Sequence, residues 1–108
     1  MNPETSHPGL SSGRWFTLTL PEQLGNVGSE YERAYNWKKK NNPAQLNKAF
    51  DRMLELLDLT LADPRWKHRL KEIARLREET CRLLEPDPLT SDLRKYFFQF
   101  ASFARRNK

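Results

Sequence analysis

The chain has 108 residues, of which 37% are hydrophobic and 31% are charged, and its formal net charge is +5. This length suits a single domain that buries enough surface to fold without metal ions or disulfides. Three tryptophans, three tyrosines and six phenylalanines exclude a wholly disordered chain, because a disordered polar chain lacks such large apolar side chains.

The sequence contains no signal for secretion or for a membrane span. Cys81 is the single cysteine, so the chain cannot form an intrachain disulfide, which suits a reducing compartment. Residues 1–13 lack the basic and apolar regions of a signal peptide. No stretch approaches the roughly 18 consecutive apolar residues of a membrane span. We therefore expect a cytoplasmic protein.

The excess positive charge lies in the second half of the chain. Residues 65–108 carry 12 Lys and Arg against 6 Asp and Glu, whereas residues 1–64 carry 7 against 8. This asymmetry favours an anionic partner, such as a nucleic acid or an acidic protein surface.

Residues 1–20 are expected to form an arm that precedes the folded domain. Residues 1–13 are rich in Pro, Ser and Gly and have no helical period, which predicts a poorly ordered start. Residues 15–20 alternate apolar and polar side chains, as a strand does, but the sequence offers no second strand to pair with them. We therefore predict an extended segment whose Phe16, Leu18 and Leu20 lie on the domain.

The first helix is predicted to start at Pro21 and to end before Asn41. Proline suits the first position of a helix, and apolar residues follow at helical spacing: Leu24, Val27, Tyr31 and Ala34. A later start remains open, because Ser29 and Glu32 match the pattern of a capping box.

The second and third helices are predicted from a capping residue followed by proline. Asn42 and Pro43 mark the start of the second helix, and Asp63 and Pro64 end it and start the third. The third helix is expected to run to about Glu85, because the prolines that follow cannot continue it.

A short aromatic fourth helix is predicted after the capping cluster of residues 90–92. Its apolar residues recur at steps of three and four: Leu93, Tyr96, Phe97, Phe100, Ala101 and Ala104. Four helices joined by tight turns predict an all-α fold, a four-helix up-down bundle over residues 21–108. A three-helix bundle with one further docked helix is the nearest alternative.

No group of residues in the sequence predicts catalysis. His7 and His68 have no matched partners, and a metal site needs several ligands that converge. Cys81 falls on the predicted inner stripe of the third helix, where a structural thiol fills space. Residues 25–29 contain two glycines but lack the Gly-Lys-Ser/Thr ending of a phosphate loop, so close helix packing or a capped turn explains them better. We therefore predict a non-enzymatic domain without cofactor, metal or catalytic residues.

Five apolar residues lie off the main core stripes of their helices: Trp37, Leu56, Leu59, Phe98 and Phe103. A single bundle of this length is not expected to cover all of them, and an exposed apolar patch marks an association surface. The preferred function is therefore protein–protein association, either as a homodimer or with another protein.

Four basic residues lie near one stripe of the predicted third helix: Lys67, Lys71, Arg75 and Arg82. Such a stripe can follow a phosphate backbone, which makes nucleic-acid binding the alternative function. Acidic residues interleave with the basic ones at spacings of three and four, and this pattern equally predicts ordinary ion pairs on a helix surface.

Short segments between residues 20 and 100 resemble a group of short uncharacterised helical proteins. The segments are residues 26–30, 33–34, 37–38, 48–50, 54–60, 63–64 and 69–72. The resemblance implies a helical fold and assigns no catalytic residue.

A looser resemblance, in architecture alone, is to the helical partners of minimal nucleotidyltransferases, including HEPN-type domains. Ribonucleases of that kind carry an Arg and a His at a wider spacing than that of Arg65 and His68. The resemblance therefore implies a helical partner of a nucleotidyltransferase and does not imply RNA cleavage.

Overall fold

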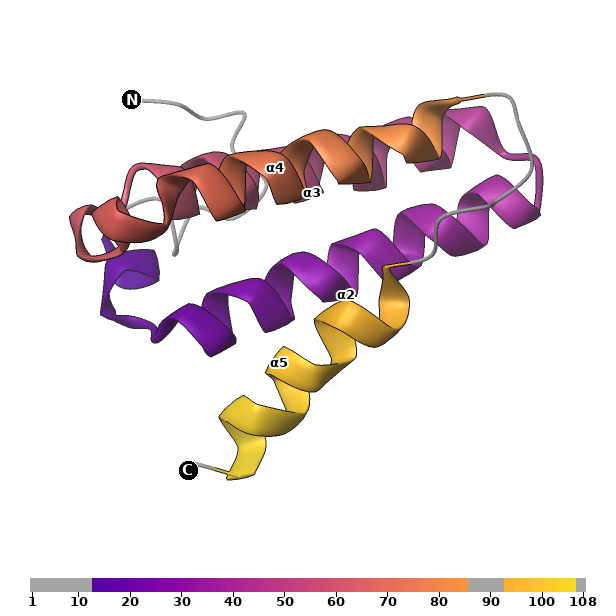
Figure 1. Ribbon diagram of the computed structural model, residues 1–108. Helices are drawn as coiled ribbons and strands as arrows, with labels where there is room; N and C mark the ends of the chain where they lie inside the picture. The colour runs from indigo at the N-terminus through magenta and orange to yellow at the C-terminus, as the bar shows by residue number, and fades with distance from the viewer. Residues whose placement is uncertain (1–12, 86–92, 107–108) are drawn as a thin grey trace.

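The computed structural model describes residues 13–85 and 93–106, and all of its regular elements are helical (Figure 1). The α-helices are α2 (Leu20–Lys39), α3 (Pro43–Leu61), α4 (Leu70–Thr80) and α5 (Arg94–Arg106). Three short 3-10 helices accompany them: η1 (Arg14–Thr17), η2 (Pro64–Arg69) and η3 (Cys81–Leu84). Because neither described range contains a strand, the all-α prediction is confirmed.

Helix α2 lies at the centre of the arrangement. Helix α3 packs antiparallel to it, and α5 crosses it obliquely on another side (Figure 1). Helix α4 runs back along α3. The core lies between these helices and is formed by large side chains from all four: Leu24, Val27, Tyr31, Phe50, Met53, Leu57, Ile73, Leu76 and Phe97.

The start of α2 agrees with the predicted start at Pro21 to within one residue. Thr19 is the N-cap: its hydroxyl accepts a hydrogen bond from the Glu22 amide at 3.2 Å, and the Glu22 carboxylate accepts one from the Thr19 amide at 2.8 Å. This capping box satisfies amides that the helix leaves unpaired. The alternative start at Ser29 is wrong, since the Ser29 hydroxyl donates to the Gly25 carbonyl inside the helix.

The start of α3 confirms the cap-and-proline prediction at Asn42 and Pro43. The Asn42 side chain accepts a hydrogen bond from the Gln45 amide at 3.2 Å, and Pro43 occupies the first turn. Proline is favoured in the first turn because an amide N–H at this position has no partner within the helix, so proline loses no hydrogen bond by lacking one.

The extended segment predicted for residues 15–20 is wrong. Residues 14–17 form η1, and Trp15 is fully buried in the core, where its indole Nε1 donates to the Thr60 hydroxyl at 3.2 Å. Phe16 and Leu18 are half-buried against the core and Leu20 is buried in it, so the predicted packing of these three residues on the domain is confirmed. A lone extended segment has no strand to pair with, whereas a 3-10 turn satisfies its own backbone and delivers the largest side chain to the core. The folded part therefore begins before the expected boundary at residue 20, and residues 1–12 lie outside the described residues.

The continuous third helix predicted from Pro64 to Glu85 is divided into η2, α4 and η3. Trp66 has a non-helical backbone (φ −102°, ψ 21°), and its indole Nε1 donates to the Gln23 side chain at 2.9 Å. The tertiary hydrogen bond thus accompanies a kink that local helix propensity does not predict. The predicted cap at residues 90–92 lies outside the described residues, and α5 begins at Arg94.

A buried polar network centred on Gln23 joins three elements at the start of α2. The fully buried Gln23 amide donates to the Trp15 carbonyl at 2.9 Å and to the Asp63 carboxylate at 3.0 Å. Arg65 pairs with the same carboxylate at 2.7 Å and donates to the Leu18 carbonyl at 2.6 Å. The network fixes η1 and η2 against α2 and leaves none of its buried side-chain N and O atoms without a hydrogen bond.

A second set of polar contacts holds the other end of α2. The Lys38 ammonium donates to the Leu83 carbonyl at 2.8 Å and to the Glu85 carbonyl, so it closes the end of η3. Halfway along, the buried Glu30 carboxylate lies 3.2 Å from Arg52 of α3 and 3.0 Å from Arg33. These contacts fix the register of α2 against its neighbours.

The Asp63–Arg65 pair predicts a loss of stability in acid. The hydrogen bond from Arg65 lowers the pKa of Asp63 from 3.8 to about 2, although burial alone would raise it. A carboxylate with a depressed pKa stabilises the fold above its unfolded-state pKa, and this contribution disappears as the pH falls through the folded value. We expect this contribution to the free energy of unfolding to be about 2 kcal/mol and to be lost between about pH 4 and pH 2.

Asp63→Asn provides the test, because it keeps the shape of the side chain and removes the charge. Urea unfolding is measured at about pH 5 and about pH 2. The parent chain should lose more unfolding free energy over this interval than the variant does. Equal pH dependence of the two chains would contradict the assigned role of the pair.

Candidate functional site

The contact between α2 and α5 depends on two glycines. A Cβ atom at Gly28 would lie 2.4 Å from the Cβ of Phe97, and one at Gly25 would lie 3.3 Å from the Cα of Ala101. Helix α5 can approach α2 this closely only because neither position carries a side chain. The glycines of residues 25–29 therefore serve close helix packing, which was one of the two explanations predicted from the sequence.

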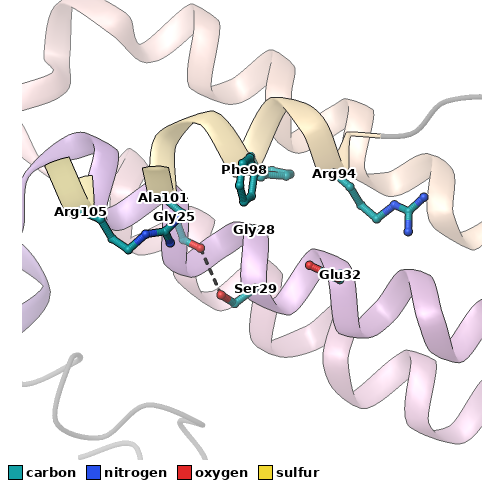
Figure 2. Close-up of a pocket in the computed structure, with 9 residues that line it drawn as sticks. Gly25, Gly28, Ser29, Glu32, Arg94, Phe98, Ala101 and Arg105 are labelled. Atoms are coloured by element: carbon teal, nitrogen blue, oxygen red, sulfur yellow. Dashed lines mark hydrogen bonds between the residues drawn. The ribbon is translucent and has the colours of Figure 1, made fainter. Parts of the chain in front are cut away.

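A groove follows this contact along one side of α5. Its first hollow, of about 200 Å³, lies between Ser29 and Glu32 of α2 and Phe98 of α5 (Figure 2). A second hollow, of about 420 Å³, continues toward the start of α2 and includes Pro21 and Glu22. Both hollows share lining residues from both helices: Gly25, Ser29, Ala101 and Arg105. We call the two hollows together the α2–α5 groove.

The two walls of the α2–α5 groove carry opposite charges. Glu22 and Glu32 lie on the α2 wall, and Arg94 and Arg105 lie on the α5 wall. Figure 2 shows the two arginines extending from opposite ends of α5, with Phe98 between them. The Arg94 guanidinium lies 4.0 Å from the centroid of the Tyr35 ring, so it stacks on an aromatic face.

Phe98 is the most exposed large apolar side chain in the described parts of the chain, at 64% of its surface. It lines the groove, and the Arg105 guanidinium lies 5.8 Å from its ring centroid. Phe103 is 48% exposed but does not line the groove. The two residues are five positions apart in the sequence, so they lie about 140° apart around the helix, on opposite flanks.

The structure does not bring the five residues of the predicted association surface together. Leu56 is 1% exposed and lies in the core, so its assignment to a surface is wrong. Trp37 and Leu59 are half-buried and pack against the core. Helix α3 is contacted by both α2 and α4, which buries more of its circumference than a single apolar stripe predicts. Of the five residues, Phe98 and Phe103 are exposed.

The four residues of the predicted anion-binding face are all exposed: Lys67, Lys71, Arg75 and Arg82. Arg82 lies 3.3 Å from Glu79 in an ordinary helix-surface pair. Lys67, Lys71 and Arg75 form no ion pair with any residue that the structure describes. Glu78 is exposed on the same helix, so the face is basic but not purely so.

The other residues considered from the sequence lie apart from the groove. His68 is exposed, and Cys81 is half-buried rather than fully buried. Over residues 13–85 and 93–106, no three His, Cys, Asp or Glu side chains come together in a way that could hold a metal ion.

The groove cannot be predicted from the sequence, because it depends on two helices that are far apart along the chain. The available signal was the pair of glycines three residues apart on one face of α2, together with the small residues Ala101 and Ala104 on α5. Small residues on both helices indicate a close crossing, but they do not say which helices cross.

Comparison with protein-family models, with curated proteins and with solved structures found no match to this chain. None of the helices in the described part of the chain has both the length and the apolar character needed to cross a membrane.

The close α2–α5 contact predicts that a side chain at position 28 is destabilising. Gly28→Val places branched carbons where the Cβ of Phe97 lies, so α5 must move away from α2. We expect a loss of about 2 kcal/mol in unfolding free energy, within the usual range for overpacking. Ser29→Val is the matched control, because residue 29 is exposed, and its effect should stay within about 0.5 kcal/mol. Equal stabilities of the two variants in urea unfolding would refute the contact.

Proposed function

We propose that the chain is a non-enzymatic helical module of the cytoplasm that binds a protein surface, its own or another, through the α2–α5 groove. The observation that carries the proposal is the exposure of Phe98 beside a groove lined by the small residues Gly25, Ser29 and Ala101. Aromatic side chains that enter a desolvated pocket supply much of the binding energy of protein interfaces.

The energetics of Phe98 support a partner. Removing a phenylalanine side chain from water is worth about 1.5–3 kcal/mol, and a Phe with 64% of its surface exposed leaves most of that unused in the isolated chain. Arg105 beside it adds a charged group that a partner can pair with.

We further infer that the four α-helices form an up-down bundle that α5 closes only in part. Helix α5 packs mainly on α2 and crosses it obliquely (Figure 1), and Phe98 and Phe103 on its two flanks are exposed. A partner that binds the Phe98 flank would bury apolar surface of α5 that the rest of the chain leaves exposed.

A photocrosslinking experiment tests the proposed function without assuming the identity of the partner. p-Benzoylphenylalanine replaces Phe98, and the full chain is expressed and irradiated in cells of its source organism. We expect a discrete protein adduct, of this chain or of another, that mass spectrometry identifies and maps. The same group in place of Asn47, which is exposed on α3, should give no such adduct. No enrichment at position 98 over position 47 would refute the proposed function.

A second candidate function is nucleic-acid binding by the face of Lys67, Lys71 and Arg75. The observation that favours it is the absence of an ion-pair partner for these three cations among the described residues. Lys71 and Arg75 lie about one turn apart on α4, and Lys67 lies on the preceding η2; cations spaced in this way can contact successive phosphates.

The salt dependence of binding tests this second candidate. The slope of log K against log salt is negative for a protein that binds RNA or DNA through phosphate contacts. If the face makes such contacts, changing all three residues to Glu should make this slope less steep by about 3. The charge-matched control changes Arg14, Lys48 and Lys95 to Glu, because these residues are exposed on other elements. If both triple variants changed this slope equally, binding would depend on net charge alone, and the second candidate function would be refuted.

A further inference from the structure

We infer that the occupant of the α2–α5 groove is a second copy of this chain, related to the first by a two-fold axis parallel to the groove. The inference rests on the proposed function, because it names the partner of the same surface. It is carried by the distribution of charge across the groove and by the position of Phe98 within it.

The charges of the two walls are complementary under one choice of two-fold axis. The α2 wall carries Glu22 and Glu32, and the α5 wall carries Arg94 and Arg105. When two grooves face each other, rotation about an axis parallel to them places the α5 wall of one copy opposite the α2 wall of the other. Basic groups then face acidic groups on both sides of the interface, as an isologous contact requires.

A two-fold axis that runs across the groove gives the opposite result. It places the α5 wall of one copy opposite the α5 wall of the other, so that arginines face arginines and glutamates face glutamates. Like charges brought together at an interface are unfavourable. The charge pattern therefore selects the axis that runs along the groove.

The parallel axis also fixes which residues meet, because it preserves position along the groove. Arg94 and Glu32 line the same hollow, so Arg94 of one copy faces Glu32 of the other. Arg105 and Glu22 line the second hollow and face each other in the same way. Glu22 also accepts the capping hydrogen bond from Thr19, and a carboxylate has acceptor sites for both partners.

Phe98 faces a small exposed side chain of the second copy. It shares the first hollow with Ser29, so in the dimer its ring faces the Ser29 part of the second copy's α2. The neighbouring Gly28 is already covered by Phe97 of its own copy, so the contact falls on Ser29, and the two rings related by symmetry are covered together. Each copy thus covers the most exposed apolar side chain of the other.

Sedimentation equilibrium of the purified full chain tests the inference. We expect a concentration-dependent equilibrium between monomer and dimer. Phe98→Ala should raise the dissociation constant by on the order of tenfold or more, as loss of a central aromatic anchor does. Phe103→Ala is the matched control: it also truncates an exposed phenylalanine of α5, but on the opposite flank, and should leave the dissociation constant unchanged.

A charge swap tests the orientation of the two copies. Glu32→Arg and Arg94→Glu should each weaken the dimer, by roughly fivefold. The double variant should have a lower dissociation constant than either single variant, because each reversed residue then faces a reversed partner, whereas the loss of Arg94 stacking on Tyr35 is common to Arg94→Glu and the double variant. Circular dichroism of each variant monitors the fold of the monomer, so that unfolding is not mistaken for dissociation.

The outcomes separate failure of the dimer from failure of the proposed function. A monomer at all concentrations up to about 100 μM, equal effects of the two phenylalanine changes, or no recovery in the double variant would overturn the two-fold dimer. If the chain is monomeric and position 98 crosslinks to a different protein, the dimer fails while the proposed function stands. If position 98 also gives no specific crosslink, both fail.

Discussion

The approach of Phe97 to Gly28 sets the distance between α5 and α2, and much of the accessible surface follows from that distance. With no side chain at positions 25 and 28, Phe97 and Ala101 pack directly on the backbone of α2, and a groove follows one side of this contact. The same contact buries Phe97, whose ring packs at a tilt against that of Tyr31 with the centroids 5.4 Å apart, and thereby turns the next residue, Phe98, toward solvent. One steric constraint thus produces both the groove and its most exposed aromatic side chain.

Helix α2 can play this role because polar contacts hold it at both ends. The Gln23 network ties its first turns to η1 and η2, and Lys38 ties its last turn to η3. Buried polar groups contribute to such order only when each has a partner, since an unpaired one costs more than a hydrogen bond supplies. No buried side-chain N or O atom in the described part of the chain lacks a hydrogen-bond partner. A central helix held in this way offers a rigid wall for binding.

Sequence patterns predicted the local events well and the long-range ones poorly. Helix starts at Asn42 and near Pro21 are encoded by neighbouring residues, so capping rules recover them. The turn that buries Trp15 and the kink at Trp66 depend on Thr60 and Gln23, which lie more than forty residues away from them. The burial of Leu56 likewise depends on the contacts of α3 with both α2 and α4, which the local sequence does not specify. The exposure of Phe98 was predicted, but the groove beside it was not, because no local pattern specifies that α5 crosses α2 at its glycines.

The most direct measurement of the central contact is the nuclear Overhauser effect between the α protons of Gly28 and the ring protons of Phe97. The short distance from the Gly28 backbone to the Phe97 side chain predicts a strong effect, and a weaker one between Gly25 and the methyl group of Ala101. Absence of both effects, while the backbone chemical shifts of residues 94–106 still report a helix, would contradict the close packing of α5 on α2. The groove and the interface proposed for it would then be withdrawn together.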